Sequence, residues 1–519
     1  MRYLMGIDVG TTGTRVLLIN QAGEVVAAAT EEYPLSTPRP QWAEQEPQDW
    51  WQATVEATRR VLASAGVKAT DIGGLGLSGQ MHGVVLLDQD DGVLRPSIIW
   101  CDQRSQAQCD CITETVGARR LIELTANPAL TGFSAPKLLW VRYNEPAVFE
   151  RARKFLLPKD YIRFRLTGEY ATEVSDASGT SLFDVRQRRW SDEVIAALGL
   201  DRALLPAVYE SPVVSGRLST AAAQATGLAK GTPVVGGGGD QAAGAVGNGV
   251  VEAGIVSSTI GSSGVVFAFT DQPRLDPQGR LQTFCHAVPG KWHVMGVTQG
   301  AGLSLRWFRD NLAGSEVQAA YLAGLDPYEL LMQEAARAAP GSEGLLWLPY
   351  LMGERAPHLD PEAKGVLFGL TARHNRFHML RAILEGVAYS LRDSLEIMRG
   401  EMGIPVTQVR ASGGGGRSAL WRQIQADVFG TEMVTINVAE GPAYGVALLA
   451  GVGTGVYASV EEACRATIRL ASRTAPIPAN VATYNAFYPI YRALYPALKP
   501  LYHQVTETIN QQINKSANL

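Results

Sequence analysis

Two short glycine turns of similar composition lie in different halves of this chain. The first is Gly10-Thr11-Thr12-Gly13 and the second is Gly261-Ser262-Ser263-Gly264. Each follows an apolar, strand-like stretch and leads into another. Glycine reaches positive φ and allows close backbone approach, so each turn could direct N–H groups and hydroxyls at a phosphate. Two such turns, from two similar halves, would form a clamp for a nucleotide.

Asp8 stands at the end of a buried-looking strand, directly before the first turn. A carboxylate in that place would hold Mg²⁺, directly or through water, and so neutralise the β- and γ-phosphates of a bound nucleotide. An aspartate that caps a tight turn would have the same local sequence. The second turn of similar type favours the metal-linked interpretation.

Asp240 ends another strand-like segment, after four successive glycines at Gly236–Gly239. Glycine costs roughly 0.5–1 kcal/mol relative to alanine in regular structure. Such a run is tolerated where a ligand must approach the backbone or where a hinge must move. An aspartate in this place is a candidate for the general base that removes a proton from a substrate hydroxyl. The alternative is a flexible interdomain turn with a solvated acid.

Polar and aromatic residues near two further strands could hold a polyhydroxylated ligand. Gln80, Met81 and His82 lie between glycines in Gly79–Gly83, although a single histidine is more often structural. Trp100 follows the strand-like Pro96–Ile99 and offers a flat face that suits a sugar. The neighbouring Asp102 and Arg104 would equally suit an ordinary surface ion pair.

A third glycine-rich segment, Ser412–Ser418, lies between a strand and a helix in the second half. Its glycines Gly414 and Gly415, together with Ser418, could accept the flat face of adenine or a phosphate at a helix N-terminus. A glycine bend needed only for packing is the competing explanation.

Two familiar nucleotide-binding motifs are absent from the chain. The segment Gly74–Gly79 matches GxGxxG formally, but the residues after it read as loop and strand instead of the helix that a dinucleotide site requires. No GxxxxGK[ST] occurs, because the only Gly-Lys pair, Gly290-Lys291, is followed by Trp292. A nicotinamide-dependent oxidoreductase is therefore disfavoured, and any ATP site is not a P-loop.

The elements that must position these residues alternate between strands and helices. Strands are expected at Tyr3–Val9, Arg15–Asn20 and Glu24–Glu31, followed by a helix that opens near Pro47 and closes at Gly66. This order predicts a mixed α/β architecture. The chain has 519 residues, too many for one core, so we expect two domains, 1–247 and 248–519.

Composition excludes several other classes of protein. The net charge is −4 without a basic run, so nucleic acid is not an expected partner. The five cysteines form neither a disulfide framework nor a zinc set. No signal sequence or uncharged apolar run of about 18 residues is present. We therefore expect a soluble cytoplasmic protein without a membrane partner, and a homodimer is left open.

With these residues assembled, the chain resembles the FGGY carbohydrate kinases over nearly its whole length. The C-terminal family signature is matched by Gly365–Leu370 with His378-Met379 and Ala382–Glu385, and the N-terminal signature by Gly132–Trp140. Within the family the chain looks most like the bacterial xylulokinases. The segments that carry this closer likeness are Gly79–Gly83, Leu157–Tyr161, Ser175–Thr180, Phe284–Ala287 and Gly353–His358.

The resemblance implies two actin-like (ribonuclease H-like) ATPase domains with a catalytic cleft between them, and ATP and Mg²⁺ as cofactors. It implies that Asp240 deprotonates the terminal hydroxyl of D-xylulose, which then attacks the γ-phosphate. Two sets of positions match those that the family uses. They are Met81, His82, Trp100 and Asp240 with Gln241 near the sugar, and Thr11, Thr12, Gly261, Ser262 and Gly414-Gly415 near the nucleotide, with Asp8 as the metal-linked acid.

Two departures from the family pattern bear on the substrate. Gln241 stands where many xylulokinases have Asn, so its longer amide could meet a different sugar hydroxyl, and ribulose or a pentitol remains an alternative substrate. Ser262 replaces a commoner Thr and keeps the hydroxyl. An actin- or chaperone-like ATP switch would share the paired turns, but it does not account for Gln80–His82 or Asp240.

Overall fold

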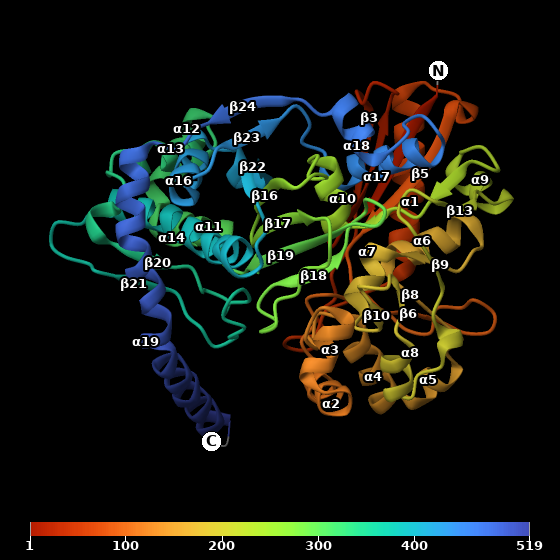
Figure 1. The fold of residues 1–519 in the computed structure, drawn as a ribbon, viewed down its shortest axis with the longest axis horizontal. Coiled ribbons are helices and arrows are strands. Elements are labelled where there is room, and N and C mark those ends of the chain that lie inside the picture. Colours follow the sequence, from red (N-terminus) through yellow and green to blue (C-terminus); the bar gives the residue numbers. More distant parts are fainter. Residues whose placement is uncertain (1, 518–519) are drawn as a thin grey trace. The chain divides into compact units, whose positions relative to one another are not determined.

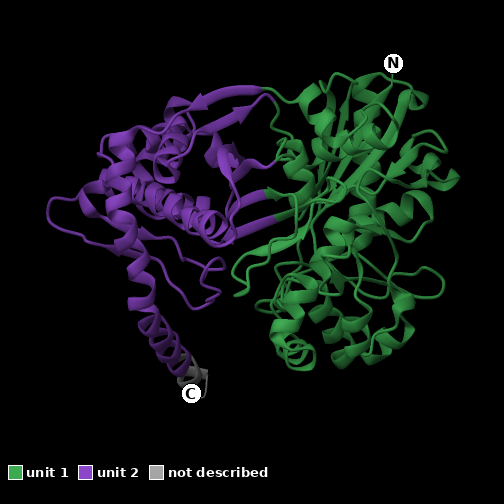
Figure 2. Cartoon of the chain, in the orientation of Figure 1, with its two compact units in different colours: residues 1–252, 269–293, 438–469 green, residues 253–268, 294–437, 470–519 purple. Residues whose placement is uncertain are grey.

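The computed structural model of the chain describes residues 2–517 (Figure 1). They form two compact units, each built from separate stretches of sequence (Figure 2). Unit 1 comprises Met1–Glu252, Phe269–His293 and Val438–Arg469. Unit 2 comprises Ala253–Ala268, Val294–Asn437 and Leu470–Leu519.

Unit 1 is organised around a seven-stranded mixed sheet. Its strand order is β13-β14-β5-β1-β2-β3, and β15 pairs with β5 as a further neighbour. The strands are β1 (Tyr3–Val9), β2 (Gly13–Ile19), β3 (Val25–Glu32), β5 (Ile72–Gly79), β13 (Val214–Arg217), β14 (Pro233–Val235) and β15 (Gly238–Gly239). β1–β3 form an antiparallel meander, as predicted from the sequence, and β5 runs parallel to β1.

Helices and short strands surround this sheet within unit 1. The helices are α1 (Pro47–Ala65), α2 (Gln106–Val116), α3 (Ala118–Thr125), α4 (Ser134–Asn144), α5 (Pro146–Arg151), α6 (Pro158–Thr167), α7 (Val174–Ala177), α8 (Asp192–Ala197), α9 (Thr220–Thr226), α10 (Asp240–Gly247), α17 (Gly441–Gly453) and α18 (Val460–Thr467). The short strands are β4 (Glu44–Gln45), β6 (Val85–Leu87), β7 (Ser97–Ile98), β8 (Lys154–Leu156), β9 (Ala171–Glu173), β10 (Phe183–Asp184), β11 (Arg189–Trp190) and β12 (Ala207–Tyr209). A further strand among the residues of unit 1, β18 (Gln282–Cys285), is the edge strand of the second seven-stranded sheet.

Helix α1 begins and ends where the sequence predicts. Pro47 occupies its first turn, where a missing N–H costs nothing. Gly66 closes it in the left-handed conformation, with φ 63° and its N–H bonded to the carbonyl of Leu62. The buried face, which includes Trp50 and Val61, packs on one side of the sheet in a core shared with β1 and β5.

On the other side of the sheet, glycines of β1 and β5 allow α17 to approach closely. A Cβ at Gly6 of β1 would lie 1.8 Å from the carbonyl oxygen of Ala443, and one at Gly76 of β5 would lie 1.9 Å from that of Val446. Side chains alternate between the two faces of a strand. Asp8, two residues after Gly6, therefore shares the α17 face, opposite the apolar core with α1.

Unit 2 repeats the strand arrangement of unit 1. Its sheet contains the neighbours β19-β17-β16-β22-β23-β24, an order that matches β3-β2-β1-β5-β14-β13 strand for strand. β16 and β17 form an antiparallel hairpin, and β22 runs parallel to β16, as β5 does to β1. The two similar halves inferred from the paired turns are thus visible in the topology.

The elements that lie wholly or mainly in unit 2 complete the fold. The strands are β16 (Gly254–Ile260), β17 (Gly264–Thr270), β19 (Trp292–Thr298), β20 (Leu346–Leu348), β21 (Val366–Phe368), β22 (Val406–Ser412), β23 (Met433–Ile436) and β24 (Leu470–Thr474). The helices are α11 (Ala301–Leu312), α12 (Gly314–Ala323), α13 (Pro327–Ala335), α14 (Arg376–Glu396), α15 (Gly413–Arg417), α16 (Ala419–Phe429) and α19 (Pro478–Ala517).

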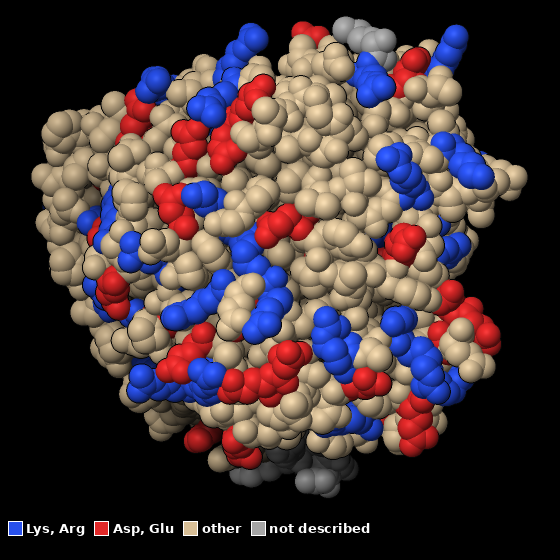
Figure 3. Space-filling view, turned by 45° about the vertical axis from the view of Figure 1, so that its right-hand side comes forward, with Lys and Arg blue, Asp and Glu red and all other residues tan. Residues whose placement is uncertain are grey.

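The surface carries both signs of charge. On the face drawn in Figure 3, acidic and basic side chains are interspersed, and neither sign forms a continuous field. Within residues 2–517, no helix combines the length and the apolar character needed to cross a bilayer.

Candidate active site

Two predicted acids flank one strand in unit 1. Ser78 of β5 is in register with Asp8 of β1 on one side and with Gly238 of β15 on the other. Asp240 follows β15 directly and is the first residue of α10. Neighbouring strands lie about 4.8 Å apart, so β1 and β15 are separated by roughly 10 Å at this end of the sheet.

Asp8 has the environment of a ligand-holding carboxylate. Burial raises its pKa from 3.8 to about 6, against the opposing effects of the Ser78 hydroxyl and the charge of Arg15. Its Oδ1 atom is buried and has no hydrogen-bond partner among the described residues. A buried carboxylate oxygen without a partner calls for an explanation, and a metal ion or its bound water would supply one.

Asp240 has the environment of a general base that works near neutral pH. Its pKa is raised from 3.8 to about 7, first by burial and then by the negative charge of Asp8. The backbone N–H and the side-chain amide of Gln241 lower it in part. A base is most effective when its pKa lies near the operating pH, and the environment moves Asp240 toward that range.

The first glycine turn is held by side chains from three other segments of unit 1. The indole Nε1 of Trp100 donates to the hydroxyl of Thr11 at 2.9 Å. Gln45 Nε2 donates to the carbonyl of Thr11 at 2.7 Å, and Gln80 Nε2 donates both to Gly10 at 3.3 Å and to Gln45 Oε1 at 2.7 Å. Thr12 is the exposed residue of the turn.

Met81 and His82 lie next to the strand that leads to Asp240. Met81 is buried, and a Cβ added at Gly239 would meet its Cγ and Sδ at 2.9 Å. His82 adopts a left-handed backbone conformation with φ 71°, and its ring packs against that of Phe133 at a tilt of 31°. Its Nδ1 lies 2.7 Å from the carbonyl oxygen of Gly179. A carbonyl only accepts, so Nδ1 carries the proton and, in the neutral ring, Nε2 carries the lone pair.

The structure therefore joins most of the predicted residues of unit 1 through direct contacts or charge coupling. Asp8 is coupled to Asp240, Thr11 is bonded to Trp100, and Met81 packs on the residue before Asp240. Gln241 is linked to this group through its hydrogen bond to Asp240.

In unit 2, the glycine-rich segment Ser412–Ser418 packs against Ile260, the residue directly before the second turn. A Cβ at Gly413 would lie 2.5 Å from the carbonyl oxygen of Ile260, and one at Gly415 would lie 2.6 Å from its Cβ. Gly261 and Ser262 follow Ile260 directly and are exposed, as is Gly414. The two predicted nucleotide segments thus lie side by side at Ile260, with Gly415 buried against it.

Backbone N–H groups at the start of α11 form hydrogen bonds with the second turn. The N–H of Gly302 donates to the carbonyl of Gly261 at 2.9 Å, and that of Leu303 donates to Ser262 at 3.0 Å. The carbonyl oxygens of Gly261 and Ser262 therefore already accept hydrogen bonds. Ser418 caps α16, since its hydroxyl accepts the N–H of Trp421 at 3.2 Å. A phosphate that bound the Ser418 hydroxyl would compete with this cap.

Several residues around the site escaped the sequence analysis. Gln45 bonds the first turn, and Ser175 accepts the N–H of Gly239 at 3.0 Å. Gln45 carries no local signal, because its partners lie elsewhere in the chain. Ser175 lies in a segment that the sequence analysis used only for the family resemblance. Its buried acidic neighbours, Glu173 and Asp176, are a signal that could have suggested a structural role.

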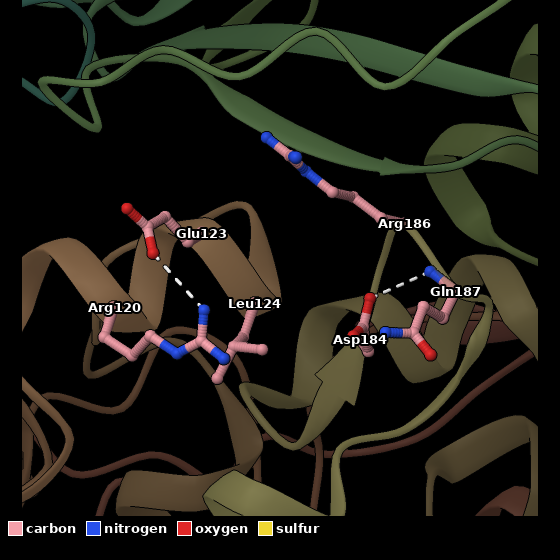
Figure 4. A pocket seen from close by; sticks show the side chains of 6 residues that line it. All are labelled: Arg120, Glu123, Leu124, Asp184, Arg186 and Gln187. Atoms are coloured by element: carbon pink, nitrogen blue, oxygen red, sulfur yellow. Dashed lines mark hydrogen bonds and ion pairs between the residues drawn. The ribbon is translucent and has the colours of Figure 1, made fainter.

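Neither a metal cluster nor a hollow on the surface of unit 1 offers a competing site. Within the described part of the chain, no three His, Cys, Asp or Glu side chains converge as a metal site. A hollow of about 410 Å³ is lined by Arg120, Glu123, Leu124, Asp184, Arg186 and Gln187 (Figure 4). None of these is a predicted site residue, and Arg120 is already paired with Glu123 and Glu193.

Comparison with known proteins identifies the class. The family models for the FGGY family of carbohydrate kinases match the chain twice, with the N-terminal domain over residues 3–247 and the C-terminal domain over residues 256–454. The chain belongs to this family, which has two mixed α/β halves of the actin-like, ribonuclease H-like ATPase type. Membership implies ATP as the phosphoryl donor and a divalent cation.

Individual relatives are similar over almost their whole length. The chain is 41% identical to the xylulose kinase of Bacillus subtilis over 484 residues, which cover 93% of this chain and 95% of that protein. It is 43% identical to the xylulose kinase of Escherichia coli over 459 residues, 88% and 91% of the two chains. The crystal structure of xylulose kinase from Rhodospirillum rubrum superposes with a TM-score of 0.89 at 31% identity and covers 97% of this chain and all of that one.

Proposed function

We propose that this chain transfers the γ-phosphoryl group of ATP to the terminal hydroxyl of D-xylulose, giving D-xylulose 5-phosphate and ADP. Family membership and the likeness to xylulose kinases support the reaction class and the substrate. The observation that carries the proposal is the pair of acids that flank β5, Asp8 and Asp240, each with a pKa raised by burial.

Asp240 is proposed as the general base. In its ionised form it accepts the proton of the terminal hydroxyl as that oxygen attacks the γ-phosphorus atom. Its place at the start of α10 suits this role, because the positive end of a helix favours the ionised carboxylate until the proton arrives. The hydrogen bonds from Gln241 restrain the carboxylate.

The sugar is proposed to lie against Met81, His82, Trp100 and Gln241. Met81 offers an apolar contact beside Gly239, and the aromatic face of Trp100 suits the carbon side of a sugar. His82 is proposed to contact a sugar hydroxyl through Nε2, because its Nδ1 faces the carbonyl oxygen of Gly179. The amide of Gln241 can both donate and accept.

The nucleotide is proposed to bind Thr11 and Thr12 of unit 1, and Gly261, Ser262, Gly414, Gly415 and Ser418 of unit 2. The exposed backbone of Gly261, Ser262 and Gly414 supports this assignment, whereas Gly415 is buried. Asp8 is proposed to hold Mg²⁺, for which its buried and unpartnered Oδ1 is a suitable donor. When bound, Mg²⁺ neutralises charge on the β- and γ-phosphates.

An ADP-release assay with a panel of acceptors tests the proposal. The panel should contain D-xylulose, ribulose, a hexulose, a pentitol, glycerol and gluconate. We expect the highest kcat/KM with D-xylulose. A preference for ribulose or the pentitol would reassign the substrate within the family, and ATP turnover indifferent to every acceptor would indicate an ATP switch instead.

Substitution of the base tests the mechanism separately. Asp240→Asn is expected to lower kcat by about 10²–10⁴-fold, the usual contribution of a positioned general base. Circular dichroism should show an unchanged fold. Near-normal turnover by the folded variant would exclude Asp240 as the base, even if D-xylulose proves to be the substrate.

Three further predictions concern the domain division, the oligomeric state and the cellular location. The domain division at residues 1–247 and 248–519 can be checked by expressing the two pieces, and a homodimer by analytical ultracentrifugation. A cytoplasmic location is proposed because ATP is the phosphoryl donor, and cell fractionation can check it.

A further inference from the structure

One buried hydroxyl connects the peptide before Asp240 to a carboxylate. The N–H of Gly239 donates to Ser175 Oγ at 3.0 Å, and the same hydroxyl donates to Glu173 Oε1 at 2.9 Å. Ser175 and Glu173 have no exposed surface. Gly239 and Asp240 share a peptide bond, so this hydrogen bond acts one residue away from the proposed base.

Glu173 is held firmly enough to serve as the anchor. It caps α7, where its carboxylate accepts the N–H groups of Ser175 at 2.7 Å and Asp176 at 2.9 Å. The hydroxyl of Ser211 donates to its Oε2 at 3.0 Å, and Lys159 Nζ lies 3.5 Å from its Oε1. This set of donors fixes the position of the buried carboxylate.

The same buried cluster holds the other end of the glycine segment. Lys159 contacts Asp160 at 2.7 Å, and Asp160 lies 3.7 Å from Arg163, one turn along α6. Arg163 donates to the carbonyl of Val235 at 2.6 Å and to that of Gly236 at 2.5 Å. The segment between Val235 and Asp240 is therefore bonded to the cluster at both ends.

External hydrogen bonds matter here because the segment has no side chains of its own. Four glycines cannot be fixed by side-chain packing, and each loses more conformational freedom on folding than any other residue. Gly237 adopts φ 71°, and a Cβ there would lie 1.9 Å from the carbonyl oxygen of Leu77. The direction in which Asp240 leaves the strand thus depends on how Gly239 is bonded.

We propose that Ser175 is a positioning residue for the phosphoryl transfer: its hydroxyl, held by Glu173, fixes the peptide that carries the base Asp240. The inference rests on the proposed function, because it assigns Ser175 a role only through Asp240. Small displacements of a catalytic group are costly, and a misplacement of about 1 Å can lower the rate by roughly 10²-fold.

Ser211 provides a matched control. It is also a fully buried serine whose hydroxyl donates to the carboxylate of Glu173, but it bonds the other oxygen, and its hydroxyl has no bond to Gly239. Ser175→Ala and Ser211→Ala each remove one donor from Glu173, so their effects on the midpoint of thermal unfolding should be similar. Only Ser175→Ala releases the N–H of Gly239.

We expect Ser175→Ala to lower kcat about 10- to 100-fold, with the KM values for ATP and D-xylulose changed far less. The acid limb of its pH profile should move to higher pH, because a displaced Asp240 loses donors from Gln241. Ser211→Ala should keep kcat and the pH profile of the wild type. Ser175→Cys keeps a side chain of similar size that forms only weak hydrogen bonds. Its kcat should lie between those of Ser175→Ala and the wild type. This variant replaces Ser175→Ala in the test if the alanine variant does not fold.

The Asp240→Asn background separates this inference from the proposed function. If Ser175 acts through the base, Ser175→Ala should cause no further loss of kcat in that background. Suppose that the wild type is active and Asp240→Asn is impaired. Equal kcat values and pH profiles for Ser175→Ala and Ser211→Ala would then overturn this inference but not the proposed function. A wild type that phosphorylates no sugar would overturn the proposed function first.

Discussion

The indole N–H of Trp100 donates a 2.9 Å hydrogen bond to the hydroxyl of Thr11. The sequence places Trp100 near a sugar and Thr11 near a phosphate, so this bond joins the two proposed ligand regions within unit 1. Gln80 reinforces the link through its hydrogen bond to the carbonyl of Gly10. A change on the sugar side should therefore reach the first phosphate turn.

We expect Trp100→Phe and Thr11→Val to be coupled. A neutral hydrogen bond contributes about 1 kcal/mol, which corresponds to roughly a five-fold change in kcat/KM. Phe keeps an aromatic ring but has no N–H to donate to the hydroxyl of Thr11. Trp100→Phe should nevertheless raise the KM for both substrates, because the lost bond joins the two proposed ligand regions. In a double-mutant cycle on kcat/KM, the combined loss should be smaller than the sum of the single losses. Thr11→Ser keeps the hydroxyl and should behave like the wild type, and strict additivity of the two changes would argue against the link.

The pH dependence of kcat/KM should report the ionisation of Asp240. The base works only when ionised, so the rate should fall as the pH drops through about 7, the raised pKa of this carboxyl. Initial rates between pH 5 and 9, with a coupling system checked at each pH, give this profile. Asp8 titrates nearby with a raised pKa of about 6, so the two acids will show apparent values that belong to the pair.

Asp8→Asn tests the origin of that shift. The negative charge of Asp8 raises the pKa of Asp240, so its removal should lower this pKa and move the acid limb of the residual activity to lower pH. The overall rate will fall as well, because Asp8 is the proposed metal-linked acid. An acid limb that stays in place would show that burial alone sets the pKa of Asp240.

The same ionisation predicts a gain in stability for an inactive variant. In the folded chain Asp240 has a pKa of about 7, against an ordinary value of 3.8. Below about pH 4 both the folded and the unfolded chain hold the proton. As the pH rises toward 7, the folded chain binds more protons than the unfolded one, so the free energy of unfolding decreases. Above pH 7 the full destabilisation by Asp240 is present.

Asp240→Asn should therefore unfold at a higher temperature than the wild type at pH 8, by roughly 1 °C for a chain of 519 residues if about 1 kcal/mol is relieved. Because Asp240 is only half-buried, solvent screening keeps this gain modest. Calorimetry at pH 4 and pH 8 provides the check, and the difference between the two proteins should vanish at pH 4. A variant less stable than the wild type at pH 8 would contradict the raised pKa.

Much of the fold could be predicted because local patterns determined it. The meander of β1–β3 and the helix from Pro47 to Gly66 have clear periodicity and turn signals, and both are confirmed. The C-terminal segment contains Pro489 and Pro496 and forms one continuous helix, α19. Its buried tyrosines pack against Tyr389 of α14, and this packing offsets the hydrogen bonds that the prolines remove.

The contacts around the site could not be predicted in the same way. Asp8 and Asp240 were identified because each stands at the end of a strand-like segment, next to a glycine turn or a glycine run. Ser175 and Gln45 act through partners that lie 64 and 34 residues away in sequence, at Gly239 and Thr11. Such contacts depend on how distant segments pack in the folded chain, which local sequence patterns do not specify. The roles of all these residues remain predictions.

The adjacent glycines Gly238 and Gly239 allow a direct test of the sugar pocket. Gly239 has φ −55°, which any residue adopts, so alanine brings no backbone strain. Its new Cβ would meet Met81 Cγ and Sδ at 2.9 Å, and the flexible Met81 side chain must move. We expect Gly239→Ala to raise the KM for D-xylulose several-fold, while the KM for ATP stays close to that of the wild type.

Gly238→Ala is the matched control, because its Cβ would make only ordinary contacts, 3.4 Å from the Ala243 nitrogen and 3.6 Å from Ser175 Oγ. It should change the KM for D-xylulose much less than Gly239→Ala does. Met81→Ala should suppress the difference, since the obstacle that the new methyl meets is gone. If Gly239→Ala raised the KM for ATP instead, or if both glycine variants behaved alike, the displaced Met81 would not be the cause, and the proposed contact between Met81 and the sugar would lose its support.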